Sequence, residues 1–301
     1  MARYSIYPSI FNTGGTPLTL NNVSSVRPST GVSQLIARAG GAVTRAAVGT
    51  AFADPRVSFT TRDLATILGA VSLTSGLAIT SASLLQYQLR ADGGTFAGGS
   101  NHVALRSHKG FLYPTSIRAT QDQTDGVPVD LDYMVLDDGT NAVLEILSAQ
   151  ALSGSPAVTD IFYLGPVVVE GVQLTGVRET SVTPGIGYET IRTDGSPYPT
   201  EGSITSVNQE MRVTSVNLAG LAARGLFGEA ISTGVTFYFQ RGLHGGDRRA
   251  FGDAVHLSIT AATGYYDFQE IPVEQGGDAL PTLNILPTGS LAINTATTIP
   301  L

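Results

Sequence analysis

The segment Val23-Ser-Ser-Val-Arg-Pro-Ser-Thr-Gly31 recurs later in the chain as Val177-Arg-Glu-Thr-Ser-Val-Thr-Pro-Gly185. Each begins with valine, ends with glycine and has a proline near its end, and the two are separated by 177 − 23 = 154 residues. The same separation relates Asp63-Leu-Ala65 to Asn217-Leu-Ala219. Glycine-rich β sequences resemble one another through composition alone, but ordered matches over about 120 residues indicate two copies of one domain.

The spacing of this repeat is nearly constant along the chain. It falls to 245 − 93 = 152 where Gly93-Gly94 meets Gly245-Gly246, and Val103 meets Val255 at the same spacing. It returns to 271 − 117 = 154 where Ile117 meets Ile271. We therefore predict one β domain at residues 1–150 and its second copy at residues 160–290.

Residues 291–301 are predicted to form a C-terminal arm. The segment is polar and rich in threonine, and it has no match at the end of the first copy. We expect such an arm to lie on a neighbouring molecule or to be disordered. Its deletion is then expected to weaken assembly and to leave folding intact.

The composition is unusual in its low charge. Only 14% of the 301 residues are charged, against roughly 25% in an ordinary soluble domain, which suits a surface covered by neighbours in an assembly. The absence of cysteine excludes disulfides and thiolate metal sites. The N-terminus lacks the apolar core of a signal peptide, and the apolar run Leu64 to Ile79 is shorter than the ~18 residues of a membrane span, so we expect a soluble protein made in the cytoplasm.

The net charge of −7 belongs to the second half of the chain. Residues 1–150 contain 10 acidic and 10 basic side chains, whereas residues 151–301 contain 14 acidic and 7 basic ones. Such a chain has no basic stripe to hold phosphates, so specific nucleic-acid binding is not expected. An acidic or neutral surface is also one past which nucleic acid slides without adhering, but such a surface more commonly serves only to keep a protein soluble.

Two hairpins are predicted at matching places in the repeat, at residues 32–50 and 187–203. Their turns contain Gly40-Gly41 and Asp194-Gly195, respectively. The alanine-rich stretch 35–48 on its own would also fit a helix, but the glycine pair at its centre and the match to the second hairpin favour a hairpin.

Each copy is also predicted to contain one short helix. Leu64, Ile67, Leu68 and Val71 form an apolar stripe at helical spacing after Thr61, a plausible N-cap. The second copy has its counterpart at residues 216–224, with Ser215 or Asn217 as the cap and Gly225 as the stop. With about seven or eight strands and one flanking helix per copy, the fold class is mainly all-β, a β-sandwich or barrel in tandem.

Residues that could carry chemistry are few, and their spacing favours structural roles. The four histidines have no metal-ligand spacing, and His256 is expected to be a strand residue facing solvent. The glycine-rich loops 91–100 and 242–249 precede strands rather than helices, so a phosphate site is not expected there. Asp130 and Asp132 share one face of a strand, and Asp137-Asp138-Gly139 is typical of a turn. No catalytic residue, metal or cofactor is predicted.

The order of parts within each copy resembles the tail-tube family of long-tailed bacteriophages. The resemblance rests on the Val-to-Pro-Gly strand pair, the hairpin with Asp194-Gly195, and a strand leading into one short helix at Arg62–Leu68 or Val216–Arg224. It covers both repeats but has no individually diagnostic motif. It implies that strands of neighbouring subunits join into a ring around a channel. A tandem duplication implies trimeric rings with pseudo-sixfold symmetry.

The resemblance implies a structural virion protein with no enzymatic activity, assembled in the host cytoplasm and located in the tail. Its partners would be other molecules of the chain, tail proteins such as terminator, hub or sheath, and passing genomic DNA without specific binding, but no membrane. The residues predicted to act in self-assembly lie in the hairpins and glycine-rich loops: Gly40, Gly41, Asp92, Gly93, Gly94, Asp194, Gly195, Gly245, Gly246, Arg248 and Arg249.

Three alternatives remain open at the level of the sequence. The doubled domain also occurs in baseplate hub or tail-tip rings. A capsid decoration or spike protein would form compact trimers that never stack. A carbohydrate-binding or hydrolytic β domain is the least favoured, because that class usually shows exposed tryptophan in a cleft and this chain has none.

Overall fold

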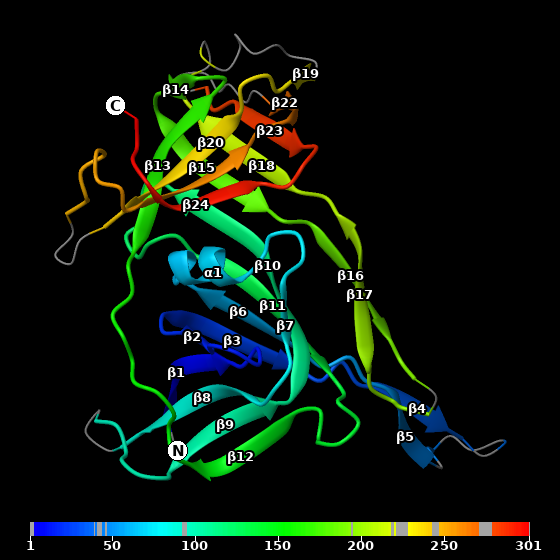
Figure 1. Ribbon diagram of the computed structural model, residues 1–301. Helices are drawn as coiled ribbons and strands as arrows, with labels where there is room; N and C mark the ends of the chain where they lie inside the picture. Colours follow the sequence, from blue (N-terminus) through cyan, green and yellow to red (C-terminus); the bar gives the residue numbers. More distant parts are fainter. Residues whose placement is uncertain are drawn as a thin grey trace.

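The computed structural model describes residues 3–38, 40, 44–45, 47–91, 95–193, 195–217, 220, 228–242, 247–270 and 279–300. Within these residues the protein consists of antiparallel strands and a single α-helix, α1 (Leu64–Ala70) (Figure 1). The prediction of a mainly all-β fold is therefore confirmed.

The first half of the chain contributes the described strands β1 to β12. They are β1 (Arg3–Phe11), β2 (Leu18–Leu20), β3 (Val23–Ser29), β4 (Ser33–Ala37), β5 (Ala47–Phe52), β6 (Arg56–Thr61), β7 (Leu77–Ile79), β8 (Ser83–Arg90), β9 (His102–Ser107), β10 (Lys109–Thr120), β11 (Val129–Leu136) and β12 (Glu145–Gln150).

The second half contributes β13 to β24. They are β13 (Phe162–Val169), β14 (Val172–Leu174), β15 (Val177–Thr183), β16 (Ile186–Ile191), β17 (Glu201–Val207), β18 (Glu210–Ser215), β19 (Glu229–Ala230), β20 (Val235–Arg241), β21 (His256–Ala261), β22 (Gly264–Glu270), β23 (Thr282–Pro287) and β24 (Ala292–Thr297). Strands β2, β3 and β6 have the same lengths as β14, β15 and β18, and each of the latter begins one repeat spacing after its counterpart.

The order of strands in the sheets is the same in the two halves. One five-stranded sheet has the order β12-β9-β8-β1-β2, and another has β24-β21-β20-β13-β14. A ten-stranded sheet runs through both halves in the order β19-β22-β23-β18-β15-β10-β11-β6-β3, with β7 also paired to β10. Within it, β3-β6-β11-β10-β7 of the first half matches β15-β18-β23-β22-β19 of the second.

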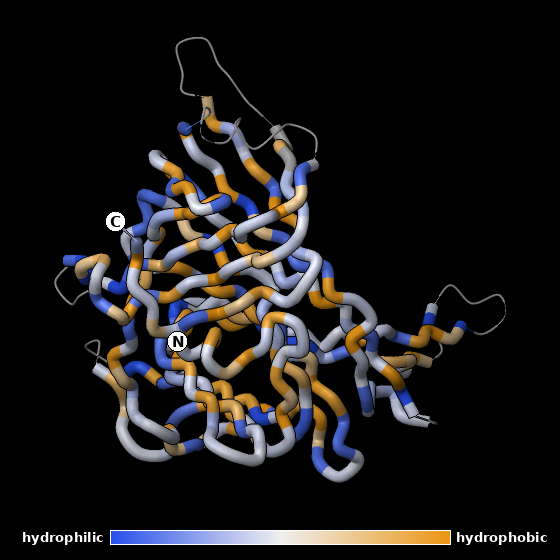
Figure 2. Tube along the Cα trace, turned by 45° about the horizontal axis from the view of Figure 1, so that its top comes forward, coloured by the Kyte–Doolittle hydropathy of each residue, from blue (hydrophilic) through white to orange (hydrophobic). Residues whose placement is uncertain are grey.

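Each five-stranded sheet lies against its own half of the ten-stranded sheet. In the first half, Phe11 of β1 contacts Phe59 of β6 and Tyr133 of β11 edge to face, with ring centroids 5.6 and 5.5 Å apart. The buried side chains of both halves form one continuous hydrophobic cluster. Apolar and polar residues alternate along the strands, as Figure 2 shows, because one face of each sheet is buried and the other is not.

Strand β6 illustrates how this alternation sets the register. Its residues Val57, Phe59 and Thr61 are buried, whereas Arg56, Ser58 and Thr60 lie on the opposite, more accessible face. β18 shows the same alternation, with its second, fourth and sixth residues buried. A shift by one residue would turn the buried set to solvent, so the pairing is strongly specified.

Three strands each contain a proline that lies at or beside a bulge. β1, β10 and β13 each shift register at or beside a proline, between Tyr7 and Ile10, Pro114 and Ser116, and Leu164 and Val167. Proline has no N–H for the ladder and is tolerated in a strand at such bulges. The pair Gly165-Pro166 thus lies at a bulge within one continuous strand.

The helix α1 has the predicted apolar stripe, with Leu64, Ile67 and Leu68 buried and Val71 buried just beyond its end. Its N-cap is Asp63 rather than Thr61. Thr61 instead accepts a hydrogen bond from the Asp63 amide and donates one to the Asn22 carbonyl. The helix predicted at 216–224 lies mostly outside the described residues, but Asn217 Oδ1 accepts a hydrogen bond from the Gly220 amide, as an N-cap does.

The prediction of a C-terminal arm at 291–301, following a domain that ends at residue 290, is wrong. β24 pairs with β21 as the edge strand of the second five-stranded sheet, in the position that β12 has in the first. Leu291 and Ile299 are buried, and the Ile299 amide donates to the Phe251 carbonyl. The segment is polar because alternate residues of an edge strand face solvent, so its composition does not indicate a free arm.

Both predicted hairpins are confirmed. β4 pairs with β5, and β16 pairs with β17, each antiparallel and each outside the three larger sheets. The alternative of an alanine-rich helix at 35–48 is therefore excluded for the described part of that stretch. No helix among the described residues has both the length and the apolar character needed to span a membrane.

Candidate assembly interface

The two halves are joined edge to edge through β10 and β15. Residues 117–120 of β10 pair antiparallel with residues 179–182 of β15, beginning with Ile117 opposite Val182. Beyond the strands, the Gln121 amide donates to the Arg178 carbonyl, and the Arg178 guanidinium donates to Gln121 Oε1 at 2.6 Å. Ile117 and Val182 are both fully buried, so this junction is as well packed as the rest of the sheet.

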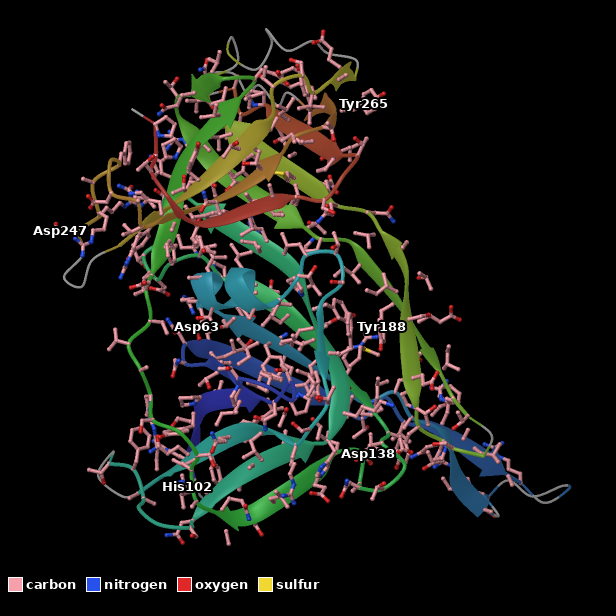
Figure 3. All side chains as sticks on the ribbon, in the orientation of Figure 1. Asp63, His102, Asp138, Tyr188, Asp247 and Tyr265 are labelled. Carbon is pink, nitrogen blue, oxygen red and sulfur yellow. The ribbon has the colours of Figure 1, made fainter. Side chains whose placement is uncertain are left out.

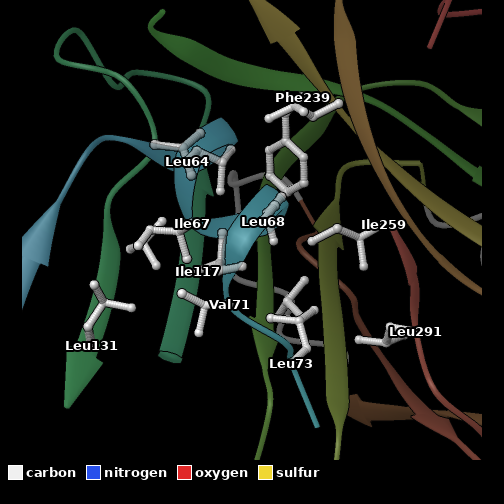
Figure 4. Packing of buried hydrophobic residues seen from close by; sticks show 14 of the residues in the cluster. Leu64, Ile67, Leu68, Val71, Leu73, Ile117, Leu131, Phe239, Ile259 and Leu291 are labelled. Carbon is white, nitrogen blue, oxygen red and sulfur yellow. The ribbon is translucent and has the colours of Figure 1, made fainter. Parts of the chain in front are cut away.

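Helix α1 and the segment after it pack across the junction onto the second half. Figure 4 shows Leu68 and Leu73 of the first half facing Phe239, Ile259 and Leu291 of the second, and all five are buried. The contact is also polar.

A buried amide side chain supplies that polar contact. Gln209 donates from Nε2 to the Leu73 carbonyl at 3.4 Å and accepts from the Leu291 amide at 3.3 Å. One side chain therefore satisfies two otherwise unpaired backbone groups and links the segment after α1 to the beginning of β24.

The hairpin β16–β17 of the second half packs onto the first half. The Tyr188 ring stacks on Phe111 with centroids 4.7 Å apart and an interplanar angle of 6°. Lys109 Nζ donates to the Thr200 carbonyl at 2.7 Å, and Arg192 forms an ion pair with Asp54.

Backbone hydrogen bonds hold the end of the same hairpin. The Ala53 amide donates to the Pro197 carbonyl at 2.8 Å, and the Asp137 amide donates to the Pro199 carbonyl at 2.7 Å. The hairpin thus covers Phe111 with an aromatic ring and is fixed at its far end by main-chain bonds.

The link between the halves is fixed by side chains of the first half. Gln86 accepts from the Ser153 amide at 2.6 Å and donates to the Ser153 carbonyl at 3.0 Å. The Val127 amide donates to the Phe162 carbonyl at the start of β13. The halves are therefore held by the sheet, the helix, the hairpin and the linker together.

The hairpin β4–β5 of the first half is held mainly at its base, where Arg192 of the second half lies over the Phe52 ring at 5.0 Å. It projects away from the body of the molecule, beyond the end of β16–β17 (Figure 1). Its side chains are exposed, including the large apolar residues Leu35, Ile36, Val48 and Phe52, of which Leu35 is 64% exposed. Exposed aliphatic residues clustered on one hairpin are typical of a surface that another molecule covers.

The second half also has an exposed aromatic ring where the first half has a covered one. Tyr265 lies one repeat spacing after Phe111, in the matching strand β22, and is 54% exposed. Figure 3 shows Tyr188 directed at the first half and the Tyr265 ring at the outer edge of the second. Leu286, which pairs with Tyr265 across the sheet, is exposed as well.

The structure places four of the residues predicted for self-assembly. Gly40 and Gly195 lie in the turns of the two hairpins, where Gly195 has a positive φ of 80°. Arg248 lies over the Tyr163 ring at 4.9 Å, and Arg249 pairs through its backbone with Arg241. The other predicted residues fall outside the described part of the chain: Gly41, Asp92, Gly93, Gly94, Asp194, Gly245 and Gly246.

These four residues are not brought together. The loop that carries Asp247 and the two arginines lies on the opposite side of the molecule from both hairpins (Figures 1 and 3). The described contacts between the halves come from β10, β15, α1 and the segment that follows it, which were not predicted as assembly elements, and from the hairpin β16–β17, which was. Pairing of distant strands leaves no local signal in the sequence, which is why the junction was missed.

The prediction that His256 faces solvent is wrong. His256 is fully buried, and its Nδ1 accepts a hydrogen bond from the Arg241 amide at 3.1 Å. His102 is buried in the same way and accepts from the Leu89 amide at 3.0 Å. The two lie 256 − 102 = 154 residues apart. β9 and β21 therefore align at a spacing of 154, and the spacing of 152 predicted at Val103 and Val255 does not apply to these strands.

The carboxylates singled out in the sequence are engaged in structural hydrogen bonds. Asp130 accepts from Thr60 and Ser116 at 2.7 and 2.8 Å, and Asp132 accepts from Ser58 at 2.7 Å. Asp138 accepts from the Asn141 and Thr140 amides in a turn, and these hydrogen bonds, with that from Asn141 largest, lower the pKa of Asp138 to about 2. Among the described residues, no group of three or more potential metal-ligating side chains converges.

The sequence matches no protein-family model, and a search of curated proteins gave no significant match.

Proposed function

We propose that the chain is a tandem duplication of one β domain in a structural protein that closes into rings. The proposal is supported by the repeated strand order of the two halves and by the equal role of His102 and His256. It is also supported by the three strand pairs that keep their lengths at the spacing of the repeat.

The junction between β10 and β15 carries the proposal. In a duplicated chain, each domain has two sheet edges that can pair with another domain. One is equivalent to the edge of β15 and the other to the edge of β10. Within the chain, the β15 edge of the second half pairs with the β10 edge of the first half. Among the described residues, two equivalent edges have no such pairing. They are the edge of β3, the counterpart of β15, and the edge near β22, the counterpart of β10.

These two remaining edges are complementary between neighbouring molecules. The β3 edge of one molecule would pair with the β22 end of the next, as β15 pairs with β10. Residues 271–274, which correspond to residues 117–120, lie outside the described part of the chain. Repetition of this head-to-tail contact closes a ring and hides the strand edges that would otherwise pair without control.

Three molecules would contribute six domains, which gives a ring with pseudo-sixfold symmetry. In the ring, the projecting hairpin β4–β5 would cover Tyr265 and Leu286 of the neighbour, as β16–β17 covers Phe111 within the chain. We further propose that such rings stack into the tube of a phage-like tail, by the resemblance to tail-tube proteins. The proposal assigns the chain no catalysis and no cofactor.

The accessible face of the ten-stranded sheet suits the lining of a tube for DNA. It carries described charges of both signs in similar numbers: Arg27, Arg56, Lys109, Arg118, Arg212, Asp130, Asp132, Glu179 and Glu210. Several are paired, including Arg118 with Glu179 and Arg212 with Glu210. A face of mixed charge offers no row of free cations to retain phosphates.

Negative-stain microscopy of the purified protein, combined with its mass in solution, tests the proposal. Threefold rings that stack into hollow tubes are the expected result. Rings that never stack would support the ring part of the proposal and favour a hub, tail-tip or decoration protein over a tube. A monomer at all concentrations would overturn the proposal.

A further inference from the structure

The first half contains an apolar pocket whose counterpart in the second half is filled. The pocket has a volume of about 460 Å³ and lies between β3, β9 and the chain before and within β12. Its lining includes Pro28, Val32, Ala53, Leu105, Leu144 and Ile146. Ile146 is 76% exposed, which is unusual for an isoleucine in a strand next to the core.

The sheet registers identify the equivalent place in the second half. Ile146 of β12 pairs with Leu105 of β9, and Ile293 of β24 pairs with Ile259 of β21. Leu105 and Ile259 lie 259 − 105 = 154 residues apart. Ile146 therefore corresponds to Ile293, which is partly buried against the hydrophobic core.

The neighbouring residues of the pocket have matching counterparts. Leu144 precedes Ile146 by two residues, as Leu291 precedes Ile293. Leu291 is buried against the segment that follows α1, with Leu73 beside it in Figure 4. Thus the site equivalent to the open pocket of the first half is occupied by Leu73 and its neighbours from the other half.

We propose that the open pocket receives the corresponding segment, residues 218–227, from a neighbouring molecule of the same chain. This segment follows Asn217 as residues 64–75 follow Asp63, and it leads to Gly228 as they lead to Gly76. Gly76 and Gly228 both have positive φ, 56° and 72°. The segment ends in Leu226-Phe227, two large apolar side chains suited to an apolar pocket.

This inference rests on the proposed ring, since it applies the contact between halves to adjacent molecules. It adds a second contact to the pairing of strand edges. Both contacts join the second half of one molecule to the first half of the same neighbour. Each molecule would offer its pocket to one neighbour and its residues 218–227 to the other. The contact is therefore heterologous, as a closed ring requires.

The substitution Ile146→Glu tests the pocket directly. Ile146 is exposed in the single chain, so the variant is expected to fold and to melt at the wild-type temperature by circular dichroism. The matched control is Val158→Glu, which places the same charge at an aliphatic residue of the linker that is 79% exposed. We expect Ile146→Glu to raise the concentration needed for assembly at least tenfold, measured by light scattering, and Val158→Glu to leave it unchanged.

A mixing experiment checks the direction of the contact. Phe227→Asp should also prevent assembly by removing the inserted side chain. An equimolar mixture of Ile146→Glu and Phe227→Asp retains one intact pocket and one intact segment, so it should give particles with the mass of two chains. A mixture that stays monomeric would count against the inference.

The outcomes separate this inference from the proposed function. If the wild type assembles and Ile146→Glu assembles as readily as Val158→Glu, the pocket is not an interface, while the ring proposal stands. If the wild type is monomeric at every concentration, both are overturned.

Discussion

At the scale of single residues, the turn between β13 and β14 shows how hydrogen bonds offset an unfavourable backbone. Glu170 and Gly171 connect Val169 to Val172 in a two-residue hairpin, and both have positive φ, 51° and 76°. Such a turn favours Asn, Asp or Gly at its first position. The Glu170 carboxylate instead accepts hydrogen bonds from the amides and hydroxyls of Ser232 and Thr233.

These hydrogen bonds predict a pH-dependent contribution to stability. Burial alone would raise the pKa of Glu170, but the bonds from Ser232 and Thr233 outweigh it and lower the pKa to about 2. Because the folded pKa is below the unfolded value of 4.5, the stabilisation is present above pH 4.5 and is lost as the pH falls towards 2. Glu170→Gln should therefore lower the free energy of unfolding at pH 7 by about 1 kcal/mol or less, since solvent screens a partly exposed group.

Urea unfolding of both proteins at pH 7, 4 and 3 measures this difference. The deficit of Glu170→Gln should shrink at the two lower values. Glu201→Gln, at an exposed residue of β17, controls for the loss of a negative charge. A deficit that is the same at all three pH values would contradict the assigned hydrogen bonds.

At the scale of elements, the last strand changes the expected result of a truncation. Deletion of Leu291–Leu301 removes β24 and with it the buried side chains of Leu291 and Ile299. Fully burying an aliphatic side chain stabilises by roughly 1.5–3 kcal/mol, so the loss is comparable with the whole stability of a domain. The edge of β21 would also be unpaired.

We therefore expect this truncation to give insoluble or unfolded protein, rather than a folded chain that fails to assemble. Soluble yield and circular dichroism measure the outcome. Deletion of Pro300 and Leu301 alone leaves β24 and Ile299 in place and serves as the control. A folded monomer lacking residues 291–301 would restore the view that the segment is an arm.

The elements differ in how far the sequence predicts them. The hairpins and α1 were predictable because their signals are local: a glycine pair at a turn, and apolar residues at helical spacing. β24 was missed because the distance in sequence from Ile146 to its counterpart Ile293 is shorter than the spacing of the repeat. His256 was misplaced because nearly every residue of β21 is buried, so its strand lacks the alternation that indicates an exposed face.

The interface was less predictable than the fold. The glycine-rich loops suggested assembly by their composition, yet the described contacts between the halves are made by ordinary strand residues such as Ile117 and Val182. Nothing in the local sequence of β10 distinguishes the end that pairs with β15. Such pairings depend on which edges of the completed sheets remain free, a property of the whole molecule.

At the scale of the whole molecule, the two halves differ in what covers them. The second half is covered by α1 and the segment ending at Leu73, which belong to the same chain. The first half receives the hairpin β16–β17, while its own hairpin β4–β5 forms a separate two-stranded sheet that projects from the molecule and meets Arg192 at Phe52 (Figure 1). Under the proposed duplication, a single chain would satisfy one junction between domains and leave one open at each end, and a ring would satisfy all of them.

The hairpin β4–β5 provides the last prediction. Ile36 and Val48 are neighbours across this hairpin, and both are exposed, so they add little to the stability of the single chain. The double substitution Ile36→Ser and Val48→Ser should leave the melting temperature unchanged, because surface substitutions usually act within about 0.5 kcal/mol each. In the proposed ring, it should prevent closure by removing the apolar contact to Tyr265 of the neighbour, and Tyr265→Ser should do the same from the other side. Val158→Ser with Val172→Ser, at exposed aliphatic residues outside β4–β5 and β16–β17, is the control for lost surface hydrophobicity. If light scattering shows that the hairpin variant assembles like this control, β4–β5 is not part of the contact, and closure of the ring must depend on the strand edges and the pocket alone.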